Sequence, residues 1–185
     1  MTERSIKALL FSDVKGFGKM SERQCLAFCR AFHSGVHENV LRRYADRISL
    51  QNTWGDALHV VMDDQVAAGH LALDLRDWME AHDWRADGLA EPPKIRIGLH
   101  AGVVSQVADP IINGCNYIGR NTSKAARIEP ITFEGQVFVS RAYAALLACR
   151  DDSGLSCEYV GKREMPKGSG FVHAYLLMRI RPNRP

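Results

Sequence analysis

The order of the apolar segments in the first half of the chain restricts its fold more than any other feature. Short runs typical of buried strands occur at 6–11, 48–54, 57–62 and 95–104. Amphipathic helical patterns separate the first run from the second and the third from the fourth. This is the element order of a split βαβ unit. The sequence therefore predicts an α+β fold, with a ferredoxin-like βαββαβ core and extra C-terminal strands and helices.

Local signals mark where the predicted elements begin. Ser21 with Gln24 three residues later predicts a capping box, and Asp63-Asp64 predicts the start of the second helix. Farther along we expect a loop rich in Asn and Gly, then a short helix at 122–128, a strand at 137–140, a helix at 141–149 and a strand at 171–178. Because no linker composition divides the chain, we expect one domain over residues 1–185.

Charge and composition narrow the possible partners. The formal net charge is only +3 and the basic residues are scattered, which argues against a nucleic-acid partner. No apolar run reaches the roughly 18 residues of a membrane helix, so we expect no membrane association and a cytoplasmic location. The five cysteines lack metal-ligand spacing, so we expect reduced thiols.

Two aspartates occupy related places in the predicted sheet. Asp13 follows the first strand, and Asp56 lies in the hairpin between the second and third. The first and third strands are the adjacent central pair of a split βαβ sheet, so both carboxylates are expected at one edge. Such a pair repels unless a cation or proton lies between, and it suits Mg²⁺ or Mn²⁺. The alternative is that each aspartate only forms a turn.

The turn after Asp13 is a candidate anion site. Lys15, Gly16 and Phe17 precede a helix, and backbone N–H groups in such a turn can point at a phosphate. Metal and phosphate would then be neighbours.

Four motifs in order resemble the catalytic domain of class III nucleotidyl cyclases. They are FSDVKGF at 11–17, NTWGD at 52–56, RIGLHAG at 96–102 and AARIE at 125–129. The resemblance implies a ring-closing reaction in which the ribose 3′-hydroxyl of a nucleoside triphosphate attacks the α-phosphorus and expels pyrophosphate. It also implies a homodimer with composite active sites.

The resemblance assigns roles to individual residues. Asp13, with the adjoining Val14, and Asp56 match the residues that bind two divalent cations, Mg or Mn. Arg127 matches the arginine that stabilises charge on the α-phosphate. Lys167 resembles a lysine that contacts the terminal phosphates, although a solvated loop lysine is nearly as good an interpretation.

Three positions depart from the adenylate cyclases of this family. Asn52 stands where they have a base-reading lysine, and Asn116 stands at their second base-reading position. Ser123 replaces an asparagine that orients the ribose, and a serine hydroxyl would act more weakly or through water. An asparagine amide both donates and accepts, so Asn52 could meet uracil or cytosine by flipping.

These departures favour a pyrimidine substrate. The NTWGD and SKAARIEPIT runs resemble the bacterial uridylate and cytidylate cyclases of the Pycsar anti-phage system, whose cyclic nucleotide acts on a separate effector. We favour UTP over CTP. An adenylate cyclase with a relaxed pocket and an inactive nucleotide-binding pseudo-cyclase are the alternatives. We expect His100 to be a hydrogen-bonded core histidine and Trp54 to be a packing residue.

Overall fold

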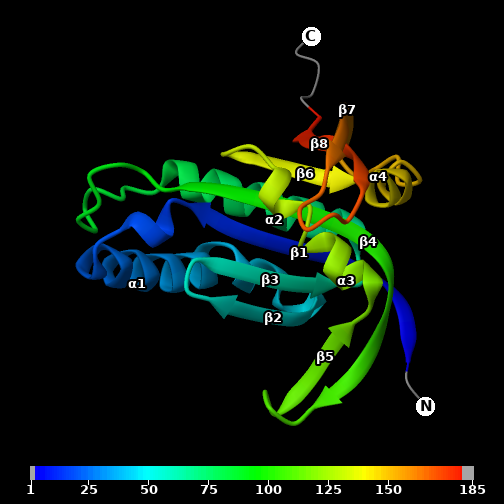
Figure 1. Cartoon of the computed structure of the whole chain (residues 1–185), viewed down its shortest axis with the longest axis horizontal. Coiled ribbons are helices and arrows are strands. Elements are labelled where there is room, and N and C mark those ends of the chain that lie inside the picture. The colour runs from blue at the N-terminus through cyan, green and yellow to red at the C-terminus, as the bar shows by residue number, and fades with distance from the viewer. Residues whose placement is uncertain (1–2, 181–185) are drawn as a thin grey trace.

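The computed structural model of the protein describes residues 3–180. Its strands form one eight-stranded mixed sheet (Figure 1). Seven of them follow the path β2 (Ile48–Trp54), β3 (Ala57–Met62), β1 (Arg4–Lys15), β4 (Lys94–Asp109), β6 (Gln136–Ser140), β8 (Phe171–Arg179) and β7 (Leu155–Glu164). The remaining strand, β5 (Gly114–Ile118), pairs with the far end of β4 outside this path.

The βαββαβ core is confirmed by the pairing of the strands. β1 lies antiparallel between β3 and β4, and β2 pairs with β3 at the edge. β6 extends this core in parallel beside β4, and the β7–β8 hairpin completes the sheet. The fold class expected from the order of apolar segments is therefore correct.

The two long helices cover one face of the sheet. α1 (Glu22–Asn39) begins at the predicted capping box of Ser21 and Gln24, and α2 (Gln65–Ala81) begins at Asp64, whose side chain accepts from two backbone N–H groups. Residues of both helices form the main core with Leu10, Val60 and neighbouring strand residues. We call this side of the sheet the helix face.

A smaller core lies on the opposite side of the sheet. There the short helix α3 (Arg120–Ala125) places Ala125 against Leu9, Val61 and Val104. Because side chains alternate along a strand, residues of odd number on β1 and β3 belong to this side. We call it the α3 face.

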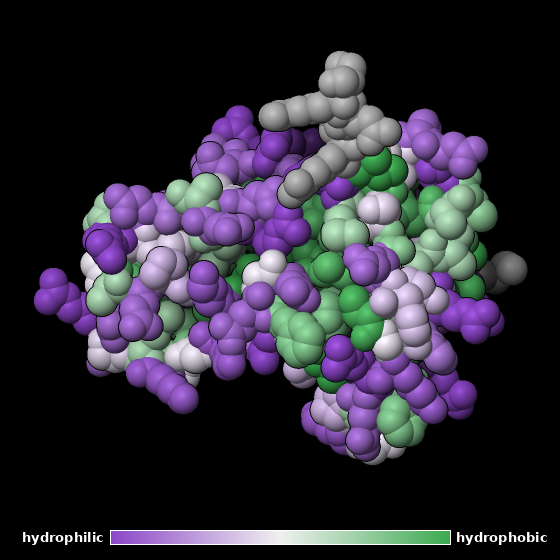
Figure 2. All heavy atoms as spheres, turned by 90° about the horizontal axis from the view of Figure 1, so that it is seen from above, coloured by the Kyte–Doolittle hydropathy of each residue, from purple (hydrophilic) through white to green (hydrophobic). Residues whose placement is uncertain are grey.

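The remaining helix and the 3₁₀ helices are short. They are η1 (Phe17–Lys19), η2 (Leu41–Arg47), η3 (Glu129–Ile131) and α4 (Arg141–Leu147). Seen from above, more apolar side chains are exposed toward the end of the molecule that carries α4 (Figure 2). No helix of residues 3–180 is long and apolar enough to cross a membrane.

Several predicted boundaries were wrong. β1 continues through Asp13 to Lys15, and β4 runs five residues beyond the predicted end at 104, to Asp109, because each strand has a pairing partner over that length. The segment expected as an Asn- and Gly-rich loop contains β5, which pairs with the β4 extension. β7 was missed, because its sequence carries many polar residues on an edge strand. The short helix ends at Ala125 rather than at 128.

Candidate active site

The structure brings the two predicted carboxylates together. Asp56 lies in the turn between β2 and β3, where Gly55 takes φ of +68°. The Val14 N–H donates to Asp56 Oδ2 at 3.4 Å, which holds the hairpin against the end of β1. Burial and the negative charge of Asp13 raise the pKa of Asp56. The pair therefore carries unfavourable negative charge that a cation would relieve.

Two charged residues beside this pair had no predicted role. Arg96, the cross-strand partner of Asp13, donates from Nη2 to Asp13 Oδ2 at 2.7 Å. Arg96 Nε lies 2.8 Å from Glu129 Oε1, but the N–H is not aimed at that oxygen, so this contact is an ion pair without a hydrogen bond. Burial raises the pKa of Glu129 to about 7. The sequence did offer one signal for Arg96, because it is a charged residue in an otherwise apolar strand run.

The turn after β1 has the predicted conformation at its glycine. Gly16 takes φ of +83° and precedes η1, whose first N–H groups have no acceptor within the helix. The ring of Phe17 packs against α1 at Phe28 and lies beside Gly55. The Lys15 side chain forms an ion pair with Glu134.

Two glycines of β4 determine how the segment carrying Arg127 lies on the sheet. A Cβ at Gly98 would be 2.5 Å from the backbone nitrogen of Glu129. A Cβ at Gly102 would be 2.4 Å from the side chain of Asn121 on α3. Only a strand without side chains at these positions allows α3 and η3 to approach so closely.

His100 on β4 also contacts the segment that carries Arg127. It is 2% exposed, its Nε2 lies 2.9 Å from Asn121 Oδ1, and its Nδ1 lies 2.7 Å from Ser140 Oγ. This agrees with the prediction of a hydrogen-bonded core histidine. Gly98, His100 and Gly102 alternate along β4, so all three face the segment formed by α3 and η3.

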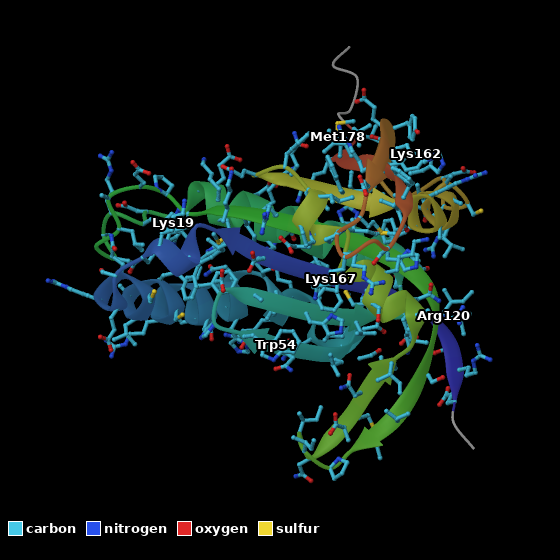
Figure 3. All side chains as sticks on the ribbon, in the orientation of Figure 1. Lys19, Trp54, Arg120, Lys162, Lys167 and Met178 are labelled. Carbon is cyan, nitrogen blue, oxygen red and sulfur yellow. The ribbon has the colours of Figure 1, made fainter. Side chains whose placement is uncertain are left out.

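Four other predicted site residues are not bonded to the carboxylates. Arg127 is half-buried in the turn after α3, Ser123 is exposed on α3, and Lys167 is exposed in the loop between β7 and β8 (Figure 3). Asn116 lies on β5 and donates to Asp109 Oδ2 at 3.2 Å. Among residues 3–180 no ion pair includes Arg127, and no hydrogen bond or ion pair links these four residues to Asp13 or Asp56.

The two residues singled out on β2 differ in exposure. Asn52 is partly buried, and its Oδ1 accepts from the Thr53 N–H at 2.9 Å. The β2 segment that contains Asn52 borders a cavity of about 360 Å³ between α1 and β2. Trp54 is 58% exposed at the end of the edge strand β2, so it does not pack within the chain as predicted (Figure 3).

The donor set at Asp13 and Asp56 fits a hard divalent cation. The residues described contain no group of three or more His, Cys, Asp or Glu side chains that could hold a metal. Two carboxylates are nevertheless sufficient for Mg²⁺, which commonly keeps water and substrate phosphate as its other ligands. The raised pKa of Asp56 shows that the site already favours added positive charge.

Sequence comparison identifies the family of this arrangement. The model of the adenylate and guanylate cyclase catalytic domain matches residues 3–179. The chain belongs to this family. Receptor-type adenylate cyclase GRESAG 4.1 of Trypanosoma brucei brucei is 26% identical over 185 residues, covering 80% of this chain and 15% of that protein. Receptor-type adenylate cyclase B of Leishmania donovani is 21% identical over 211 residues, covering 95% and 16%.

Solved cyclase structures share the fold. The adenylyl cyclase CyaB from P. aeruginosa superposes with a TM-score of 0.83 at 20% identity over the full length of both chains. The guanylate cyclase domain of RhGC from Catenaria anguillulae, solved with GTP, gives 0.78 at 19% identity, covering 96% of this chain and 98% of that one. The chain spans about a sixth of the length of the curated cyclases named above.

Proposed function

We propose that this cyclase-family protein is a metal-dependent nucleotidyl cyclase that converts a pyrimidine nucleoside triphosphate, UTP in preference to CTP, to a 3′,5′-cyclic nucleotide and pyrophosphate. The observation that carries the reaction type is the contact between the Asp56 hairpin and the end of β1 beside Asp13. We further propose that residues 1–185 form one catalytic domain.

Each half of the proposed site has a distinct task. Asp13 and Asp56, with the backbone of Val14, would hold two divalent ions, Mg or Mn. Bound there, these ions supply Lewis acidity to the 3′-hydroxyl and neutralise the triphosphate. The N–H groups around Lys15, Gly16 and Phe17 would donate hydrogen bonds to phosphate oxygens, and Lys167 would contact the terminal phosphates.

The second half of the site would come from a partner subunit. Arg127 is the catalytic residue of this half, because its guanidinium fork can donate to the oxygens on which charge develops. Ser123 orients the ribose, and Asn52 and Asn116 contact the base. Among residues 3–180, Arg127, Ser123 and Asn116 make no hydrogen bond or ion pair with the carboxylates, and Arg127 forms no ion pair at all, which supports a composite homodimer.

The base assignment depends on Asn52. A lysine at this position only donates and reaches farther, whereas the shorter asparagine suits a different base edge. We extend the proposal to anti-phage signalling of the Pycsar kind, supported by the NTWGD and SKAARIEPIT runs. The cyclic nucleotide would then act on a separate effector protein.

The product assay tests both parts of this proposal. Purified protein is incubated with ATP, GTP, CTP or UTP and Mn²⁺, and products are resolved by chromatography and mass. Cyclic UMP as the dominant product is the expected result. A dominant cyclic purine would overturn the base assignment and leave the reaction type intact.

Two alternatives are tested in the same experiment. An adenylate cyclase is favoured by the trypanosomatid relatives, which are receptor-type adenylate cyclases, and cyclic AMP would be its product. An inactive nucleotide-binding protein is favoured by Ser123, and it would bind nucleotide without forming any cyclic product.

A further inference from the structure

A buried histidine on the α3 face has an unused hydrogen-bonding atom. His59 on β3 is 4% exposed, and its Nδ1 lies 2.9 Å from the carbonyl oxygen of Leu10. Its Nε2 is buried and has no hydrogen-bond partner among the residues described. A buried polar atom without a partner loses its hydrogen bonds to water and gains none in return, so such an atom is unfavourable.

The surroundings of His59 determine which ring nitrogen carries the proton. A carbonyl oxygen can only accept, so Nδ1 must be the donor in its contact with Leu10. Burial lowers the pKa of His59, which keeps the ring neutral at pH 7. Nε2 is therefore an acceptor, and the stacked ring of Phe11, 4.0 Å away between centroids, restrains the imidazole plane.

The strand register places this acceptor beside Asn52. Asn52 and His59 are direct cross-strand partners, and His59 in turn pairs with Phe11. Direct partners point to the same face with Cβ atoms about 4.5–5.5 Å apart, which is within reach of one hydrogen bond between their side chains. The row Asn52, His59, Phe11 lies on the face that also carries Asp13.

The Asn52 amide offers the matching donor. Its Oδ1 is occupied by the Thr53 N–H at 2.9 Å, and Nδ2 makes no hydrogen bond among residues 3–180. An acceptor at His59 can pair only with the NH₂ side of the amide. One Nδ2 hydrogen can therefore bond to His59 while the other points outward.

We propose that His59 is a positioning residue that holds the Asn52 amide with its N–H side toward the base. Asn52 then reads an acceptor on the base edge, such as O4 of uracil, and disfavours a donor at the same position, such as the N4 amine of cytosine. This inference rests on the proposed role of Asn52 in contacting the base. It removes the ambiguity of an amide that could otherwise flip.

The test compares kcat/KM for UTP and CTP in matched variants. His59→Phe keeps an aromatic ring against Phe11 and removes the acceptor. His59→Gln keeps an acceptor near the Nε2 position. We expect the UTP-to-CTP ratio of the wild type to fall at least tenfold in His59→Phe and to stay within about threefold in His59→Gln.

A third variant tests the same inference from Asn52. Asn52→Asp replaces a donor by an acceptor, so the preference should invert toward CTP. Melting temperatures of all three variants establish that each is folded. A packing role for His59 would lower the rates with UTP and CTP equally, and an unchanged ratio in folded His59→Phe would overturn the inference.

Failure of the proposed function gives a different result. If the wild type cyclises purines, the pyrimidine assignment fails. The ratio of kcat/KM for ATP to that for GTP is then measured in place of the ratio for UTP and CTP. Adenine presents an acceptor at N1 and guanine a donor, so the same collapse in His59→Phe is expected. If no nucleotide is cyclised, the ratio of dissociation constants for UTP and CTP, measured with Mn²⁺, decides the inference.

Discussion

At the scale of single residues, the negative charge of the site is only partly neutralised by the protein's own basic side chains. Arg96 contacts Asp13 and Glu129, but no basic side chain among residues 3–180 forms an ion pair with Asp56. Burial and the charge of Asp13 raise the pKa of Asp56. Glu129 is buried behind Arg96, and its pKa of about 7 reflects that burial. Metal binding and proton binding therefore both stabilise the same small cluster.

Replacing Asp56 should separate metal binding from folding. In Asp56→Asn, the stabilisation by Mn²⁺ seen in the wild type should disappear, because a ligand that binds only the folded state raises its stability. Cyclase activity should fall more than about 100-fold, beyond the 10–100-fold typical of residues that only support a metal ligand. Melting curves with EDTA and with Mn²⁺ provide the measurement.

Asp46→Asn is the matched control for this change, because Asp46 has an 80% exposed side chain. It should keep both the Mn²⁺ response and the activity. An Asp56→Asn protein that is still stabilised by Mn²⁺ would contradict the assignment of Asp56 as a ligand.

Glu129 should make the metal-free protein less stable as the pH rises. Its pKa in the folded state is about 7, above the usual 4.5, so the folded state binds this proton more tightly than the unfolded state does. The contribution is full below about pH 4.5 and is lost as the pH rises through 7, with an upper limit of about 3 kcal/mol.

Glu129→Gln should remove that part of the pH dependence. Urea unfolding in EDTA at pH 5 and pH 8 measures the difference in unfolding free energy for each protein. The exposed Glu134 offers a control, and Glu134→Gln should retain the wild-type drop. An equal drop in Glu129→Gln would show that Glu129 does not titrate in this range.

At the scale of elements, β4 is the support for both halves of the proposed site. It pairs with β1 beside Asp13, and its glycines receive α3 and η3 near Arg127. Because no ion pair within the described part of the chain includes Arg127, its position depends on the backbone packing of its segment on β4.

Adding one methyl group to β4 should disturb this support. In Gly98→Ala the new Cβ would lie 2.5 Å from the backbone nitrogen of Glu129, so η3 must move. We expect a loss of about 1–3 kcal/mol in unfolding free energy, typical of overpacking, and a lower kcat. In the control Gly114→Ala, the nearest atom would be 3.8 Å away, and both quantities should change little.

At the scale of the whole molecule, the proposed site is complete only in a dimer. Asp13 lies on β1 and Asp56 in the β2–β3 hairpin, whereas Ser123 lies on α3, Arg127 in the turn after it and Asn116 on β5. Among residues 3–180, no hydrogen bond or ion pair joins these three residues to the two carboxylates. The β4–β5 arm projects from the rest of the chain (Figure 1) and ends near Ile111, which is 92% exposed.

Mixing two inactive variants should restore part of the activity. Asp56→Asn and Arg127→Ala should each be inactive alone, because each removes one half of every site. A random mixed dimer has one site with both halves intact, so an equal mixture should recover about a quarter of the wild-type rate. Folded, dimeric variants that fail to complement would argue that all residues of a site come from one chain.

The sequence by itself determined the element order, the helix starts at Ser21 and Asp64, and the two carboxylates beside glycine turns, because these depend on local periodicity and capping. Only the tertiary structure decided what depends on pairing across the sheet. It showed that β5 is a strand, that Trp54 is exposed on an edge, and that Arg96 and Glu129 join the carboxylate cluster. The neighbourhood of His59 and Asn52 is of the same kind, because register joins residues that no local pattern relates.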